Sequence, residues 1–213
     1  MPTSLNRPNL PELSEREWDR RLRIRTVGRE DESDPNYSPY EPTPYGVLRR
    51  LAESGHITRK NHLLDYGCGK GRVAFFMAAV VGCRATGIDM SQKLIDIARE
   101  NRRSSRLGDR VALKRCLAEQ YEPEDEDFLF FFNPFSEKVF AGVLRRVANA
   151  LKDRPRALTV ACYYPSEAYV ECLDETDILK PVDDIDCNDL FNGKQNPRER
   201  VIVYRAQADP AET

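Results

Sequence analysis

The residues best suited to chemistry in this chain are a short glycine-rich stretch and the acidic residue ahead of it. An apolar run ends at Asp65 and leads to Gly67, Gly69 and Gly71, spaced G-x-G-x-G. Glycine permits positive φ in a tight turn and lets a ligand approach the backbone without meeting a Cβ atom. The free N–H groups of a helix start offer hydrogen bonds to a polar ligand. The pattern therefore predicts a strand, a turn and a helix around a nucleotide-like ligand.

The glycine spacing separates two kinds of nucleotide ligand. A dinucleotide fingerprint reads G-x-G-x-x-G, which differs from the closer spacing found here. The stretch from Leu63 to Arg72 resembles the first motif of the class I S-adenosylmethionine-dependent methyltransferases, (apolar)-(apolar)-D/E-x-G-x-G-x-G. The resemblance implies that this loop holds the methionine part of the cofactor. The residues that it implies for this role are Asp65, Gly67, Cys68, Gly69 and Gly71; a plain strand-to-helix turn is the alternative for the glycines.

A second segment fits the same family in the expected order. Residues 85–91 are typical of a strand that ends at Asp89, eighteen positions after Gly71. The resemblance implies that this carboxylate accepts hydrogen bonds from the ribose hydroxyls. Met90 would pack on the adenine face. An N-cap for Asp89 and ordinary core packing for Met90 are the alternatives.

The adenine end departs from the family pattern. Many members have an acidic residue after the third strand, where this sequence has Leu117. Backbone groups of Leu117 or Ala118, or the longer side chain of Glu119, are therefore the predicted contacts to adenine. A solvated loop position is the alternative for Glu119.

A third segment places an amide and an aromatic ring at the end of another apolar strand. Residues 128–132 are apolar and are followed by Asn133, Pro134 and Phe135. In the family, (D/N/S)-P-P-(F/Y/W) occurs in enzymes that methylate exocyclic amino nitrogens. There the amide oxygen and the next backbone carbonyl accept the amine hydrogens, and the ring stacks on the substrate. The resemblance implies these catalytic roles here, with Asn133 also beside the cofactor; a helix cap is its alternative.

The N-terminal part of the chain is predicted to be an extension, residues 1–43, ahead of a methyltransferase domain, residues 44–213. A helix is expected between Ser14 and Thr26, and the tyrosine- and proline-rich stretch from 28 to 44 is expected to be a loop or lid. Some protein-lysine methyltransferases of this class have a similar Y-x-P-(S/T)-x segment. Tyr37 and Tyr45 are therefore predicted to contact the cofactor, with packing as the alternative.

The rest of the chain alternates between extended and helical patterns. Thr43 is expected to cap a helix that starts at Pro44. Strands are predicted near 62–66, 84–88, 110–115, 127–132, 157–163, 178–186 and 200–205, and helices near 71–81, 91–103, 137–151 and 166–173. This order predicts an α/β fold: a three-layer, Rossmann-like, seven-stranded, mainly parallel sheet with helices on both faces, whose ligand lies at the carboxyl ends of the strands. The resemblance implies that the last strand is antiparallel.

Composition restricts the function classes. The chain has 213 residues, 40% of them hydrophobic, which suits one soluble domain, and no apolar run is long enough to cross a bilayer. A cytoplasmic protein is expected, with its six cysteines reduced and no metal site, because no C-x-x-C pair occurs. The net charge of −2 does not favour a nucleic-acid partner, although two arginine-rich blocks leave that partner open.

The leading hypothesis is an S-adenosylmethionine-dependent methyltransferase that transfers a methyl group to a nitrogen of a small molecule, protein or RNA. The alternatives are a non-catalytic regulatory module that binds the same cofactor and an NAD-dependent oxidoreductase. Fold does not identify the acceptor, and the sequence leaves its identity and the oligomeric state open.

Overall fold

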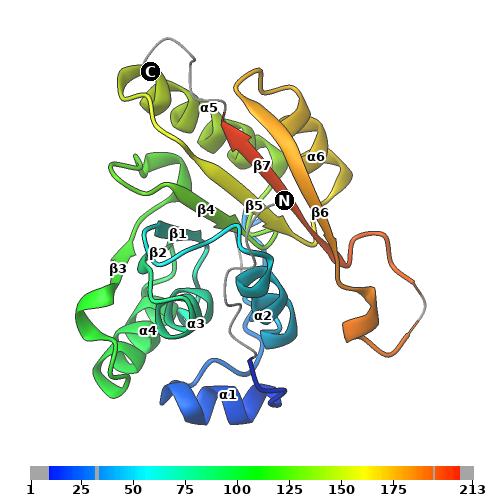
Figure 1. Cartoon of the computed structure of the whole chain (residues 1–213). Helices are drawn as coiled ribbons and strands as arrows, with labels where there is room; N and C mark the ends of the chain where they lie inside the picture. Colours follow the sequence, from blue (N-terminus) through cyan, green and yellow to red (C-terminus); the bar gives the residue numbers. More distant parts are fainter. Residues whose placement is uncertain (1–9, 32–33, 194, 207–213) are drawn as a thin grey trace.

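The computed structural model describes residues 10–31, 34–193 and 195–206, which form a three-layer α/β fold (Figure 1). Residues 1–9 of the predicted extension lie outside this range. The strands are β1 His62–Tyr66, β2 Arg84–Asp89, β3 Val111–Arg115, β4 Phe128–Phe131, β5 Thr159–Tyr163, β6 Leu179–Asp186 and β7 Arg200–Ala206. The helices are α1 Glu15–Leu22, α2 Tyr45–Ser54, α3 Arg72–Val80, α4 Gln92–Ser104, α5 Glu137–Asp153 and α6 Glu167–Asp174. These elements confirm the predicted alternation.

The seven strands form one sheet in the order β3-β2-β1-β4-β5-β7-β6. Strands β3, β2, β1, β4 and β5 pair in parallel, and β7 runs antiparallel to both β5 and β6. The predicted fold class and the antiparallel last strand are thereby confirmed. The chain order reverses direction beside β1, so the carboxyl ends of β1, β2 and β4 meet at one edge, where ligands bind in such folds.

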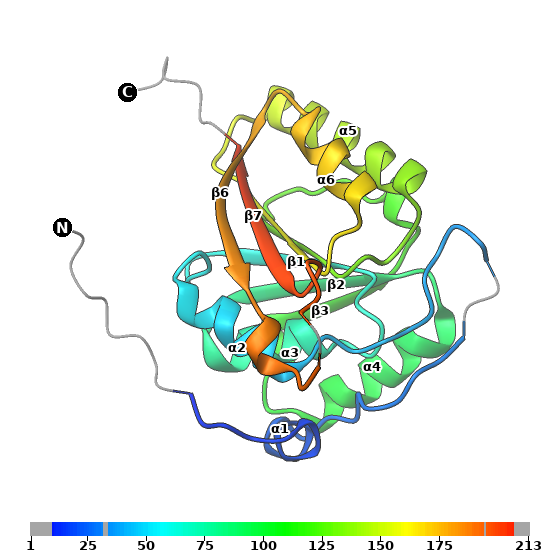
Figure 2. The ribbon, with the colours of Figure 1, turned by 90° about the vertical axis from the view of Figure 1, so that its right-hand side faces the viewer.

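Alternation along the central strands separates two apolar layers. Leu63, Phe128 and Phe130 face a core shared with α1, α2 and α3. Leu129 and Phe131 face the opposite core, which α5 and α6 cover. Both figures place α1 to α4 on one side of the sheet and α5 and α6 on the other (Figures 1 and 2). The sheet is buried on both faces, as expected for parallel strands.

The N-terminal helix joins the first of these cores. The Trp18 ring lies 5.0 Å from that of Phe76 in α3 and 5.7 Å from that of Tyr45 in α2. The helix ends at Leu22, earlier than predicted, because Arg23 takes a left-handed conformation with φ of 59°. The described part of the extension therefore shares a core with the predicted domain.

The start of α2 differs from the prediction. Its N-cap is Pro44, and Tyr45 is the first helical residue. The first N–H of the helix, that of Tyr45, donates to a carboxylate oxygen of Glu15 in α1 at 3.0 Å. Thr43 is buried, and its carbonyl accepts a bond from Arg72. The expected cap at Thr43 is wrong because another helix supplies it. Among the described residues, no helix is both long enough and apolar enough to cross a membrane.

Candidate cofactor and acceptor site

A cavity of about 610 Å³ opens at the carboxyl ends of the parallel strands. Its size lies within the range typical of small-molecule sites. The predicted site residues that line it are Asp65, Gly67, Cys68, Asp89, Met90, Ala118, Asn133, Pro134, Phe135 and Tyr37. The fold thus gathers into one hollow the ends of β1, β2 and β4, which lie far apart in sequence.

The glycine loop forms the turn that its spacing predicts. Gly67, Gly69 and Gly71 have φ of 72°, 52° and 86°, a region that other residues rarely adopt. A Cβ atom on Gly67 would lie 2.5 Å from Cβ of Pro134, and one on Gly69 would collide with the Tyr40 ring. The space beside these two glycines is therefore filled by the protein, whereas the sequence predicted the approach of a ligand there. Gly69 and Gly71 shape the loop without lining the cavity.

Asp65 lines the cavity, and one of its carboxylate oxygens makes no hydrogen bond to the described part of the chain. The residue is 3% exposed, and its Oδ2 has no hydrogen-bond partner among the described residues. Burial, and then the nearby Asp89 carboxylate, raises the pKa of Asp65 to about 8. A buried carboxylate without a counter-charge is costly. A cationic amine placed here would remove that cost, so this position fits the amino acid part of S-adenosylmethionine.

Asp89 is held in a fixed orientation at the end of β2. One carboxylate oxygen accepts the Gly69 N–H at 2.8 Å and the other accepts the Ser91 N–H at 2.8 Å. Ser91, not Asp89, is the N-cap of α4. A carboxylate oxygen can accept more than one bond, which is the chemistry that a pair of ribose hydroxyls requires. The neighbouring Ile88 and Met90 give the cavity an apolar wall beside it.

The three residues that the sequence predicted near adenine have different positions in the structure. Ala118 lines the cavity, whereas Leu117 and Glu119 do not. The Glu119 carboxylate accepts a hydrogen bond of 2.8 Å from the Tyr37 hydroxyl. Glu119 therefore positions Tyr37, and the described lining on this side consists of small and apolar groups.

The segment after β4 carries strain at the cavity. Asn133 has φ of 44°, which is rare for a residue with a side chain, and such strain tends to gather at functional positions. Its carbonyl accepts a bond from the Ser38 hydroxyl at 2.7 Å, and the Pro134 carbonyl accepts the Ser38 N–H at 2.9 Å. The carbonyl expected to receive an amine hydrogen is thus already paired. Phe135 is 4% exposed and packs edge-on against Tyr37.

The two tyrosines predicted at the cofactor have different positions. Tyr37 lines the cavity. Tyr45 is 1% exposed and lies in the core, where its hydroxyl donates to Asp19 at 2.7 Å and the Arg72 guanidinium stacks 4.3 Å from its ring centre. The structure therefore places Tyr45 away from the cavity, because the first turn of α2 faces α1 and α3. Tyr40, which lies between Tyr37 and Tyr45 in the sequence, lines the cavity instead.

A further wall of the cavity is formed by residues that follow β5 and by residues that precede β7. Tyr163 and Tyr164 follow β5, and the hydroxyl of Tyr163 donates to Glu199 at 2.8 Å. Tyr164 has φ of 52°, and the Arg198 guanidinium lies 4.2 Å from its ring centre. Glu199, Arg198 and Phe191 come from the end of the chain and reach the cavity through the antiparallel return of β7. Only the Tyr-Tyr-Pro sequence after the fifth strand pointed to this wall.

The fold and the cavity define a class. A seven-stranded sheet with one antiparallel strand next to the last position, and a glycine turn after β1, is the arrangement that the sequence motifs predicted. Residues 63–154 match the family model described as a methyltransferase domain. This match, which covers less than half of the chain, and the fold agree with the resemblance to the class I S-adenosylmethionine-dependent methyltransferases.

Individual proteins with related sequences match only part of the chain. The ribosomal protein L11 methyltransferase of Shewanella amazonensis is 33% identical over 90 residues, which cover 42% of this chain and 28% of the relative. The histone-lysine N-methyltransferase specific for H3 lysine-79 of Dictyostelium discoideum is 38% identical over 77 residues, covering 34% of this chain and 4% of that protein. The chain thus spans under a third of the length of these curated relatives.

Solved structures resemble a larger share of the chain. An RNA methyltransferase from Salinibacter ruber, in complex with S-adenosyl-L-homocysteine, aligns with a TM-score of 0.52 and 19% identity, covering 81% of this chain and 96% of that one. The magnesium protoporphyrin IX methyltransferase of Synechocystis with bound S-adenosylmethionine aligns with a TM-score of 0.57 and 15% identity, covering 76% and 77%. At these identities the likeness establishes the fold.

Proposed function

We propose that this protein is an S-adenosylmethionine-dependent methyltransferase whose acceptor atom is a nitrogen. The observation that carries the proposal is the pair of carboxylates at the ends of β1 and β2, Asp65 with an unsatisfied buried oxygen and Asp89 held by two backbone N–H groups. A ligand that has a cationic amine at one end and vicinal hydroxyls beyond it suits both. A pyrophosphate has no cationic group for Asp65, and it would meet the negative charge of Asp89.

Different side chains would contact different parts of the cofactor. Asp65 would hold the amine and Asp89 the ribose hydroxyls, while Ile88, Met90 and Ala118 would enclose the base with apolar contacts. When bound, the cofactor supplies an electrophilic methyl group on a sulfonium that is already a good leaving group. The chain's own task is to align the acceptor and to exclude water, and alignment alone can be worth roughly 7–11 kcal/mol.

Nitrogen is supported by the acceptor end of the cavity. A neutral amine needs no general base, and no histidine is among the described residues that line the cavity. The Asn133 side chain offers an amide oxygen that can accept one amine hydrogen. The Pro134 carbonyl, the second acceptor of the family motif, already accepts the Ser38 N–H, so an amine hydrogen would share this oxygen. A protein amine is favoured, since both curated relatives are named for protein substrates.

Two measurements test this function. Calorimetry should give micromolar affinity for S-adenosylmethionine and S-adenosylhomocysteine and none for NAD, and tighter binding of NAD would refute the cofactor assignment. Labelled methyl transfer into an extract of cells lacking this protein should then label a protein, RNA or metabolite fraction. Cofactor binding without any labelled acceptor would instead favour the non-catalytic regulatory module. A base-labile methyl ester would contradict nitrogen, whereas recovery of the label as an N-methyl group after hydrolysis of the labelled fraction would support it.

A further inference from the structure

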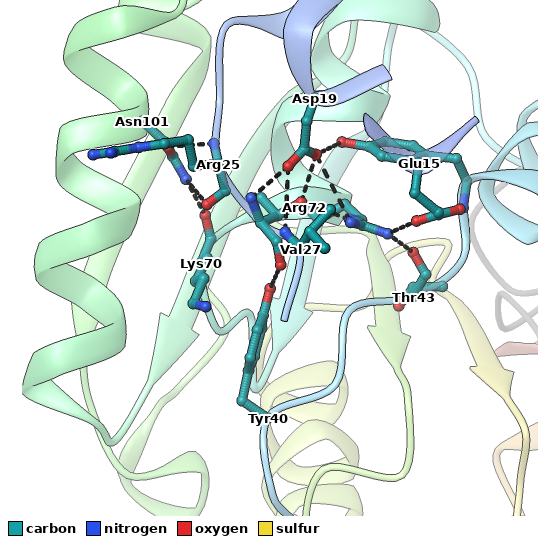
Figure 3. Close-up of polar contacts among 11 residues, drawn as sticks. Glu15, Asp19, Arg25, Val27, Tyr40, Thr43, Lys70, Arg72 and Asn101 are labelled. Carbon is teal, nitrogen blue, oxygen red and sulfur yellow. Dashed lines mark hydrogen bonds and ion pairs between the residues drawn. The ribbon is translucent and has the colours of Figure 1, made fainter. Parts of the chain in front are cut away.

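Arg72 is a buried cation placed directly after the glycine turn. It is the first residue of α3 and is 2% exposed. Its Nε donates to the Thr26 hydroxyl at 2.7 Å, and its Nη1 donates to the Thr43 carbonyl at 3.1 Å and to the Glu15 carboxylate. Figure 3 shows these bonds converging on the guanidinium from two segments ahead of β1. A buried guanidinium is costly unless it is paired and hydrogen-bonded, so these partners are needed for the first turn of α3 to remain in place.

The counter-charges come from the N-terminal helix. Glu15 and Asp19 lie one turn apart on α1, and both approach Arg72, Asp19 with an Oδ1–Nη2 separation of 3.8 Å. Asp19 is itself 7% exposed. Detachment of α1 would leave Arg72 without either carboxylate in an apolar setting beside the Tyr45 ring. Docking of this helix and the conformation after Gly71 are therefore energetically linked.

Asp19 also orders the chain that follows the helix. Its carboxylate accepts bonds from the Thr26 N–H at 2.6 Å, the Thr26 hydroxyl at 2.7 Å and the Val27 N–H at 3.3 Å. The adjacent residue, Arg25, pairs through its backbone with the side chain of Asn101 in α4, at 2.8 Å and 3.2 Å. The same amide donates to the Lys70 carbonyl in the glycine loop at 3.0 Å. Figure 2 shows the chain after α1 passing beside α4.

The ordered segment in turn holds a wall of the cavity. The Thr26 carbonyl accepts the Tyr40 hydroxyl at 2.5 Å. The Tyr40 ring lies against Gly69, so closely that a Cβ there would collide with it, and the Lys70 ammonium is 4.7 Å from the ring centre. Tyr40 also lines the cavity. A series of buried and partly buried contacts thus runs from α1 through Thr26 and Tyr40 to the glycine loop. Figure 3 shows its two ends, Asp19 and Tyr40.

We infer that the segment Glu15–Val27 is a positioning element for the cofactor loop, so that docking of this segment and binding of the cofactor stabilise each other. The inference rests on the proposed function and goes beyond it, because it assigns a role to a part of the chain that lies ahead of every methyltransferase motif. Arg72 and Tyr40 act here as positioning residues. Coupling between two sites is reciprocal, so the cofactor must tighten the segment by the same factor by which the segment tightens the cofactor.

The first test removes one hydroxyl. Tyr40→Phe keeps the ring against Gly69 and deletes the bond to Thr26, whereas the control Tyr204→Phe deletes an equally short bond, 2.6 Å to Asp174, far from the cavity. We expect Tyr40→Phe to weaken S-adenosylhomocysteine binding about 2- to 10-fold, as for loss of one hydrogen bond, and the control to leave it unchanged. Calorimetry at a temperature well below unfolding measures both. Equal affinities in the two variants would overturn the inference.

The second test measures how readily a protease cleaves the segment Glu15–Val27. Trypsin can cut after Arg25, whose side chain is exposed while its backbone is bonded to Asn101. Saturating S-adenosylhomocysteine should slow this cut several-fold in the native protein, and much less in Tyr40→Phe. Cleavage at an unchanged rate would show that the segment is merely structural. Failure of the native protein to bind S-adenosylhomocysteine is a separate outcome, which would overturn the proposed function together with this inference.

Discussion

The first prediction concerns the charge of Asp65. The pH dependence of stability and of cofactor binding separates the effect of this charge from the effect of the side chain's size. Burial, with a further contribution from Asp89, raises its pKa from an ordinary value of 3.8 to about 8. Between these values the folded protein without ligand binds a proton that the unfolded chain has released. The contribution of Asp65 to the free energy of unfolding should therefore fall by up to about 1.4 kcal/mol per pH unit from pH 4 to 8, and no further above pH 8.

The substitution Asp65→Asn removes this titration while keeping the size of the side chain. Its free energy of unfolding should show a shallower dependence on pH than that of the native protein in the same window. The pKa difference corresponds to a total cost of roughly 6 kcal/mol for ionising Asp65 without a ligand, so at pH 8 the variant should be the more stable protein. A less stable Asp65→Asn protein at pH 8 would contradict the burial argument.

Cofactor binding should have the opposite dependence on pH. An ammonium beside Asp65 favours the ionised carboxylate, so binding below pH 8 must expel the proton. Affinity for S-adenosylhomocysteine should rise up to tenfold per pH unit between pH 6 and 8 and then level off. The Asp65→Asn protein should not show this rise in affinity with pH. The amine of the free ligand titrates identically in both experiments, so below pH 8, where this amine stays protonated, the difference between the two proteins isolates this one carboxyl group.

Calorimetry in two buffers of different ionisation enthalpy measures the protons released. Near pH 6.5 we expect about one more proton released by the native protein than by Asp65→Asn, from the single group that titrates. The reasoning is refuted if the two proteins release equal numbers, or if their affinities have the same pH dependence. In that case the cationic group of the ligand lies elsewhere in the cavity.

The remaining predictions concern three other positions. Asp89→Ala should weaken cofactor binding by roughly 1.5–3 kcal/mol, the worth of hydrogen bonds to a charged group, and an unchanged dissociation constant in a folded variant would show that another residue holds the ribose. Asn133→Ala should lower single-turnover methylation while leaving cofactor affinity near the native value; lower thermal stability with a normal rate would make Asn133 a structural residue. Gly67→Ala should cost roughly 1–3 kcal/mol in chemical unfolding, because the new methyl group would meet Pro134 at 2.5 Å in a backbone with φ of 72°.

Two features of the site that the sequence did not predict share one physical reason. The sequence predicted that the Pro134 carbonyl would accept a substrate hydrogen and that Tyr45 would reach the cofactor. In the structure Ser38, almost one hundred positions ahead, donates to that carbonyl, and α1 and α3 enclose Tyr45. Hydrogen-bond partners of this kind come from segments that only tertiary packing brings together. No local spacing records which of them will meet.

What the sequence determined by itself was the sheet and its ligand-binding edge. Alternating helical and extended patterns imply right-handed crossovers, which leave little choice of strand order and bring the ends of β1, β2 and β4 together. The positions of Asp65, Asp89 and Asn133 at that edge follow from periodicity and from the residues that end each strand. Glycine at 67 was readable for the same reason, since a turn with positive φ needs it.

Only the tertiary structure decided which side chains complete the site. Arg72 reads in the sequence as one more helical arginine, yet it is buried among Glu15, Asp19 and Thr26, forty-six or more positions ahead of it. A buried charge is stable only where distant partners converge on it, and that convergence is a property of three-dimensional packing. The fold depends on patterns that repeat along the chain, whereas the surroundings of the cofactor loop depend on single contacts between remote residues.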